Sequence, residues 1–94
     1  MEREVFVLIK NHQFDCGECG LDCIGVYDTF ELAQKTCESQ MEKSRDEMKE
    51  YVADTEEDDY SKGDMSWSIW EKGEYCYNHI DLLIQQAQIV NEEV

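Results

Sequence analysis

The chain has 94 residues, with 23 Asp and Glu against 8 Lys and Arg, which gives a formal net charge of −15. A length of this order predicts one small domain. A charge of this sign excludes DNA, RNA and anionic membranes as direct partners and favours basic surfaces. The hydrophobic fraction of 41%, with two tryptophans, argues against intrinsic disorder.

The chain shows no membrane-spanning or secretory pattern. No apolar run approaches the roughly 18 residues of a transmembrane helix. The opening, MEREVFVLIK, places acids before a short apolar run, whereas a secretory signal has a basic start and a longer apolar core. We therefore expect a cytoplasmic protein with reduced thiols, in the host cytoplasm if the gene belongs to a phage.

The first quarter of the chain predicts a hairpin. The segment VFVLIK is rich in β-branched and apolar residues, and so is CIGVY. They predict strands over about 4–11 and 23–27. Gly17 and Gly20 lie between them and are typical of a turn.

A helix is predicted over about 30–52. Asp28 and Thr29 are both good N-caps, and Asp28 with Glu31 has the spacing of a capping box. Apolar residues then recur at helical intervals and form one stripe, with polar residues opposite. The stripe consists of Ala33, Cys37, Met41, Met48 and Val52.

The second half of the chain predicts a loop and a strand, and then an ambiguous tail. The acidic segment 53–64 is interpreted as a loop. In MSWSIW the apolar residues alternate with serine, which predicts a strand over about 65–71 with Trp67 in the core and Trp70 on the opposite face. The tail, HIDLLIQQAQIV, fits a helix capped by Asn78 and also fits a strand over about 80–90.

Three segments resemble a group of small, uncharacterised bacterial and phage proteins. They are EVFVLIKNH, LDCIGVYDTFELAQK and IDLLIQQAQIV, with the matching positions at Ile24–Tyr27, at the cap Asp28–Thr29 and at Ala33. The group has a first strand, an IGV(F/Y) strand, a capped helix and a final strand. The resemblance implies an α+β domain of ββαββ order, with one antiparallel sheet packed by one long helix. It favours a strand for the tail, paired with 65–71, and implies no catalytic residues.

The segment FDCGECGLDC raises the question of a metal or redox site. His12, Cys16, Cys19 and Cys23 form H-x3-C-x2-C-x3-C, a set that would suit zinc if the two strand ends bring the four side chains together. Only one C-x2-C pair is present, so we expect an ordinary hairpin connection without a cofactor. Asp15, Glu18 and Asp22 would raise the thiol pKa values, which disfavours redox chemistry.

Nothing in the chain indicates an enzyme. His12 and His79 each lie near a cysteine, but no nucleophile elbow or glycine-rich phosphate loop is present. Paired carboxylates are unavoidable in so acidic a chain and therefore indicate little. We expect a protein without catalytic residues.

Acidic residues form a regular row on the predicted helix. Glu38, Glu42, Asp46 and Glu50 recur every four residues, about 6 Å apart along the axis. This is close to the distance between phosphates along a DNA strand, which exceeds the axial rise of about 3.4 Å because the strand winds. The ordinary interpretation is a solvated helix face, with Lys43, Arg45 and Lys49 offsetting part of the repulsion.

Two functions follow from these patterns. In the first, the row and the acidic segment mimic nucleic acid and occupy the basic groove of a host nucleic-acid-binding enzyme, in the manner of anti-CRISPR and anti-restriction inhibitors, which are similar in size and charge. The expected contacts are Glu38, Glu42, Asp46, Glu50, Asp54, Glu56, Glu57, Asp58, Asp59, Trp70 and Tyr75. In the second, the chain is an interaction or regulatory module that binds a protein partner through its aromatic residues, and a zinc staple is left open for it.

Overall fold

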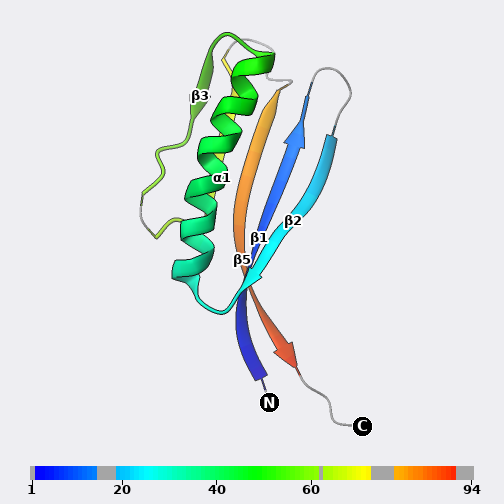
Figure 1. The fold of residues 1–94 in the computed structure, drawn as a ribbon, viewed down its shortest axis with the longest axis vertical. Coiled ribbons are helices and arrows are strands. Elements are labelled where there is room, and N and C mark those ends of the chain that lie inside the picture. The colour runs from blue at the N-terminus through cyan, green and yellow to red at the C-terminus, as the bar shows by residue number, and fades with distance from the viewer. Residues whose placement is uncertain (1, 15–18, 62, 73–77, 91–94) are drawn as a thin grey trace.

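The computed structural model describes residues 2–14, 19–61, 63–72 and 78–90 (Figure 1). In chain order its elements are β1 (Glu2–Gln13), β2 (Cys19–Tyr27), α1 (Phe30–Tyr51), β3 (Thr55–Glu57), β4 (Ser66–Glu71) and β5 (His79–Val90). The predicted α+β class is confirmed. The order is ββαβββ rather than ββαββ, because a short strand lies in the segment that the sequence predicted as a loop.

The five strands form one antiparallel sheet in the order β2-β1-β5-β4-β3. The tail is a strand, as predicted, and it pairs with β1 along its whole length and with β4 over residues 79–83. Its central position explains its apolar character, because Ile80, Leu82 and Ile84 all point into the core and are buried. Strand pairing on both sides leaves no room for the helical alternative.

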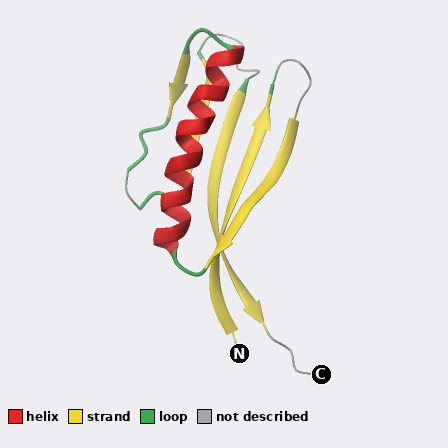
Figure 2. Cartoon of the chain, viewed as in Figure 1, coloured by secondary structure: helices red, strands yellow, loops and turns green. Residues whose placement is uncertain are grey.

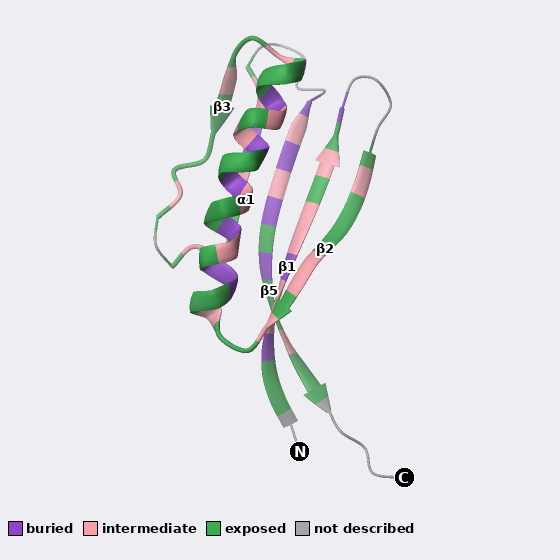
Figure 3. Ribbon diagram, viewed as in Figure 1, coloured by how far each residue is buried: buried purple, intermediate pink, exposed green. Residues whose placement is uncertain are grey.

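Helix α1 covers one face of the sheet, and the core lies between these two layers (Figure 3). Four members of the predicted stripe are buried, namely Ala33, Cys37, Met41 and Met48, whereas Val52 is the C-cap just after the helix and packs half-buried against the core. Trp67 is also buried, as expected from the alternation in MSWSIW. Met65, which the same alternation placed with Trp67, lies just before β4 and is exposed.

The helix begins one residue later than a capping box would require. The hydroxyl oxygen of Thr29 accepts a hydrogen bond from the Leu32 backbone N–H (3.2 Å), so Thr29 is the N-cap. Asp28 instead forms an ion pair with Arg3 at 3.0 Å. The predicted box from Asp28 to Glu31 is therefore wrong, since Glu31 stands two rather than three positions after the cap.

Both strands of the first hairpin are longer than predicted, because Gly20 belongs to β2 rather than to a turn. A Cβ on Gly20 would lie 2.9 Å from Cε1 of His12, its neighbour across the ladder. A larger residue at position 20 would therefore displace the His12 ring from this position. The pairing shifts register between Leu8 and Ile9, so the hairpin contains a bulge.

Strand β3 corrects the prediction of a loop over 53–64. Thr55, Glu56 and Glu57 pair with Glu71, Trp70 and Ile69 of β4. The sequence predicted a loop here because the segment is rich in acidic residues. A short edge strand can also consist mostly of acidic residues, because charge on an edge strand discourages pairing with other chains. After β3 the chain descends beside α1 (Figure 1).

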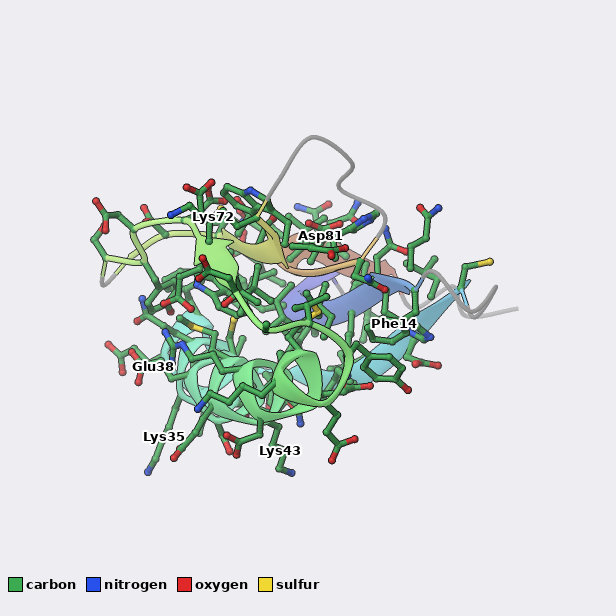
Figure 4. The ribbon with its side chains drawn as sticks, turned by 90° about the horizontal axis from the view of Figure 1, so that it is seen from above. Phe14, Lys35, Glu38, Lys43, Lys72 and Asp81 are labelled. Atoms are coloured by element: carbon green, nitrogen blue, oxygen red, sulfur yellow. The ribbon has the colours of Figure 1, made fainter. Side chains whose placement is uncertain are left out.

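In the described part of the chain, no element covers the face of the sheet opposite α1 (Figure 2). The strand register assigns Val7, Ile9, Leu83 and Trp70 to this open face, because their ladder neighbours alternate with the buried residues. Figure 4 shows Asp81 on the same side, away from the helix. No described helix is long and apolar enough to cross a membrane.

Candidate functional site

The structure separates the described members of the cysteine–histidine string. His12 pairs with Gly20, whereas Cys19 pairs with Gln13 and Cys23 with Ile9. Alternation along the ladder therefore turns His12 toward the helix side and both cysteines toward the open face. Cys16 lies outside the described residues. Among the residues that the structure describes, no group of three or more His, Cys, Asp or Glu is placed to hold a metal ion.

The acidic row on α1 is exposed, but it does not stay on one side of the helix. Each step of four residues turns about 40° around the axis, so Glu50 is rotated by about 120° from Glu38. Arg45 marks the side that faces β3, and it lies close to the angle of Glu38. Glu38 and Glu42 therefore lie on the side of the helix that faces Arg45 and Tyr60, whereas Asp46 and Glu50 are rotated further from that side.

Arg45 joins the helix to β3. Its guanidinium donates two hydrogen bonds of 2.8 Å to the Glu57 carboxylate, and its Cζ lies 5.4 Å from the ring centroid of Trp67. These hydrogen bonds lower the pKa of Glu57 and, with the charges of Glu57 and Glu42, raise the pKa of Arg45. Glu57 is therefore a neutralised structural residue rather than a free carboxylate, and it contributes to the fold before any partner binds.

Other carboxylates beside α1 remain without a cation. Two further ion pairs on α1 join Lys10 to Glu47 at 2.9 Å and Lys49 to Asp46 at 3.9 Å. No ion pair within the described residues involves the other exposed acids of the row and of the segment after it, which are Glu38, Glu42, Glu50, Asp54, Glu56, Asp58 and Asp59. We call Glu38, Glu42, Asp58 and Asp59 the acidic edge. They belong to the exposed flank formed by α1 and the segment after β3.

A pocket opens beside the first half of α1. It has a volume of about 340 Å³, and its described lining consists of Glu31, Gln34, Lys35 and Glu38. Figure 4 shows Glu38 projecting sideways from the helix, while Lys35 and Lys43 both point away from the sheet. The pocket therefore adjoins the acidic edge through Glu38.

Four buried polar atoms between α1 and the following strands have no hydrogen bond of good geometry within the described residues: Nε2 of Gln34, Oγ of Ser44, the Tyr60 hydroxyl and Nε1 of Trp67. Burial raises the pKa of Tyr60, and the nearby Cys37, Glu38 and Asp64 raise it further. The Gln34 amide lowers it, so amide and hydroxyl face each other, but their geometry falls short of a hydrogen bond. The apolar pattern missed Gln34 and Ser44, whose only signal was their position on the buried side of the stripe.

The aromatic residues proposed for binding do not adjoin the acidic edge. Trp70 is half-buried on the open face, where its strand neighbours are His79 and Glu56. Glu56 therefore also turns toward the open face and away from α1. Tyr75 lies outside the described residues. The structure thus divides the predicted contacts between two surfaces.

The open face carries several large apolar side chains. The exposed fractions are 71% for Leu21, 55% for Val26, 43% for Leu83 and 41% for Ile89. Leu21, Leu83 and Ile89 share the register of the open face. Leu83 lies beside Ile9 across the ladder, and adjoining apolar side chains on an uncovered face are typical of a surface that meets another molecule.

The chain matches no protein-family model, no curated protein and no solved structure.

Proposed function

We propose that this protein is a non-enzymatic inhibitor that binds the basic nucleic-acid groove of a host defence enzyme through its acidic edge. In this role the edge takes the place of a phosphate backbone, and the fold supplies a rigid support for it. The basic residues that line the partner's groove would contact the carboxylates of the acidic edge. A protein of this kind needs no cofactor and contacts no nucleic acid itself.

The observation that carries the proposal is the unneutralised charge along α1 and the segment after β3. Arg45 faces this side, but Glu57 already engages it with both carboxylate oxygens. Glu38 and Glu42 stand on the same side of the helix without an ion pair among the described residues. Their charge is therefore available to a basic partner, with no internal ion pair to break first.

Such an interface depends on salt in a characteristic way. Charge pairs at a wet interface speed association and set the orientation of the partner, and both effects are screened beyond about 8 Å at physiological ionic strength. Nucleic acid and the inhibitor would compete for the same cations. Binding should therefore weaken steeply with salt, and added DNA or RNA should displace the protein from its partner.

The test uses two double variants of equal charge. Glu38→Gln/Glu42→Gln removes two acids from the edge, and Asp22→Asn/Asp81→Asn removes two from the sheet. The immobilised proteins are incubated with host lysate, and bound proteins are eluted at constant ionic strength with duplex DNA or with RNA. We expect elution of nucleic-acid-binding proteins from the unmodified chain, at least about tenfold weaker capture (about 1.4 kcal/mol) by the edge variant, and unchanged capture by the sheet variant.

Two results would refute the proposal. In one, both double variants lose the partner equally, which would mean that only net charge matters. In the other, the captured proteins resist nucleic acid and remain bound at about 1 M salt, where the screening length is only about 3 Å.

A second function is favoured by the open face. Its exposed Leu21 and Leu83, with Trp70 in the same register, fit a module that binds a protein partner through apolar contacts. For this function Trp70→Ala and Leu83→Ser would weaken binding most, and salt would have little effect. The capture assay separates the two functions. Binding through the acidic edge predicts normal capture by Trp70→Ala and Leu83→Ser, whereas binding through the open face predicts normal capture by Glu38→Gln/Glu42→Gln.

A further inference from the structure

One edge of strand β5 has no neighbouring strand over the second half of its length. On the side of β4, β5 pairs only over residues 79–83, and the Ile84 N–H then donates to the Met65 carbonyl (2.7 Å). On its other side, β5 pairs with β1 as far as Val90. Figure 1 shows this half of β5 projecting with the start of β1 past the first turn of α1. Within the described residues, 85–90 therefore form an open sheet edge.

The alternation of the strand identifies the backbone groups on this edge. In an antiparallel ladder the N–H and the C=O of one residue point to the same side, and successive residues point to opposite sides. The N–H of Ile84 points toward β4. The backbone groups of Gln86, Gln88 and Val90 therefore point to the open edge, whereas those of the residues between them point toward β1. Their N–H and C=O groups are left to water or to another strand.

This edge lacks the features that usually keep sheet edges from pairing. Natural edge strands are short, charged or bulged. Strand β3 has three residues, of which Glu56 and Glu57 are acidic, and the β2 edge carries a bulge. By contrast, the sequence has no charged residue from Leu82 to Val90, although 33% of the chain is charged. The second half of β5 is therefore suited to pairing with a further strand.

We propose that two copies of the chain pair through this edge, with β5 antiparallel to β5 about a two-fold axis at Gln88. Such an axis relates the two strands of an antiparallel pair, so a strand can be its own complement. With Gln88 opposite its counterpart, Gln86 lies opposite Val90, and all the backbone groups on the edge exchange hydrogen bonds. A shift by two residues would leave Gln86 or Val90 without a partner among the described residues. The proposal does not depend on what the acidic edge binds.

The side chains that this register brings together are compatible. Ala87 lies opposite Ile89 of the second copy, so apolar residues meet on the open face, where Ile89 is exposed in the single chain. Gln88 is also exposed, and its amide faces an identical amide that can both donate and accept. No like charges stand directly opposite each other, an arrangement that would destabilise a cross-strand pair.

Electrostatics favours this end of the molecule for self-association. Each copy carries a net charge of −15, so two copies repel each other over most of their surfaces. Ile84 is the last buried core residue of β5, and it stands four positions from the axis. The two Ile84 positions are therefore separated by eight residues, or about 27 Å along the ladder. This is several times the screening length of about 8 Å, so the pairing joins the copies end to end without bringing their acidic bodies together.

Sedimentation equilibrium of the full chain tests the pairing, with reductant present so that the exposed Cys19 and Cys23 form no disulfide. The contact is smaller than the roughly 1,200 Å² of stable interfaces, so we expect a Kd on the order of 100 μM. Association should stop at the dimer, because the contact occupies the edge of both copies. A chain that stays monomeric at about five times this Kd, or that forms a continuous series of oligomers, would overturn the proposal.

Salt provides an independent check. Raising the ionic strength from about 0.05 to about 0.5 M should strengthen the dimer severalfold, because screening reduces the repulsion between two acidic copies. Binding of the acidic edge to a basic partner would weaken under the same change. A dimer that dissociates as salt rises would show that charge pairs hold it together, which contradicts pairing through an uncharged edge.

Substitutions at the axis test the register. Gln88→Pro removes the N–H that points to the open edge and leaves the ladder with β1 in place, so it should weaken the dimer at least about tenfold through two lost hydrogen bonds. Gln88→Thr is the matched control, because it keeps the N–H and suits a strand, and it should dimerise almost normally. Circular dichroism checks that each variant folds.

A second pair of variants keeps the test decisive if Gln88→Pro does not fold. Gln88→Lys places two like charges at the axis and should weaken the dimer at least about threefold. Ser39→Lys adds the same charge at an exposed position on α1, and it should dimerise at least as well as the unmodified chain. Unchanged dimerisation of the folded position-88 variants, or loss of the dimer on Leu83→Ser instead, would show that the copies meet elsewhere.

Discussion

Ser44 offers a prediction that runs against the usual effect of a core substitution. It is fully buried on α1 between Met41 and Met48, and its Oγ has no hydrogen-bond partner among the described residues. Replacing it with alanine removes an unsatisfied hydroxyl that costs about 1–3 kcal/mol. Alanine is also the better helix former by about 0.5 kcal/mol. The cavity left by one oxygen offsets part of this gain.

We therefore expect Ser44→Ala to raise the free energy of unfolding by about 1–2 kcal/mol. For a domain of this size each kilocalorie corresponds to about 4–8 °C in Tm. The measurement is urea denaturation followed by circular dichroism, with thermal melts alongside. Ser39→Ala is the matched control, because Ser39 is exposed on the same helix and its substitution should yield only the propensity gain of about 0.5 kcal/mol.

The comparison of the two serines decides the outcome. If Ser44→Ala stabilises the protein no more than Ser39→Ala does, or destabilises it, the hydroxyl must have a hydrogen-bond partner in solution, such as a buried water. The reasoning that treats it as unsatisfied would then be wrong.

Two further predictions concern groups with shifted pKa values. The pKa of Glu57 is lowered by Arg45, so its contribution to stability is present above the ordinary glutamate pKa and is lost as pH falls through the lower pKa of the folded state. Urea midpoints at pH 6 and pH 3 should show that Glu57→Gln loses less stability on acidification than the unmodified chain, by no more than about 1 kcal/mol because the pair is partly exposed. Equal losses would contradict this role. Burial raises the pKa of Cys37 to about 11, so iodoacetamide at pH 8 should modify the exposed Cys19 within minutes but Cys37 only in urea. Mass spectrometry reads the result, and prompt labelling of Cys37 in the native protein would show that the helix opens readily.

Much of the fold followed from local patterns. The helix over Phe30–Tyr51 and its buried stripe could be predicted because a period of 3.6 residues persisted over six turns. The alternation in MSWSIW identified β4 and the burial of Trp67 because a period of two residues places Trp67 and Ile69 on one face of a strand. The tail was ambiguous by pattern, since its apolar residues fit both periods, and strand pairing with β1 and β4 decided it.

The candidate site was less accessible to sequence reasoning. The acids could be counted, but which of them remain free depends on contacts between residues far apart in the chain. Arg45 neutralises Glu57, twelve positions away, and Glu56 turns with Trp70 to the other face. Acidic character is a property of the side chain, whereas exposure and pairing are properties of the assembled layers.

Composition by itself determined the sign of the protein's long-range electrostatic field, because a net charge of −15 acts at long range whatever the fold. Only the tertiary structure decided which surface carries that charge without internal pairing and where the pocket lies. Gln34 is an unremarkable polar residue in the sequence. The structure places it in the interior beside Tyr60, because it lies on the buried side of α1. Local propensity cannot encode such a meeting, because it arises only when helix and sheet pack together.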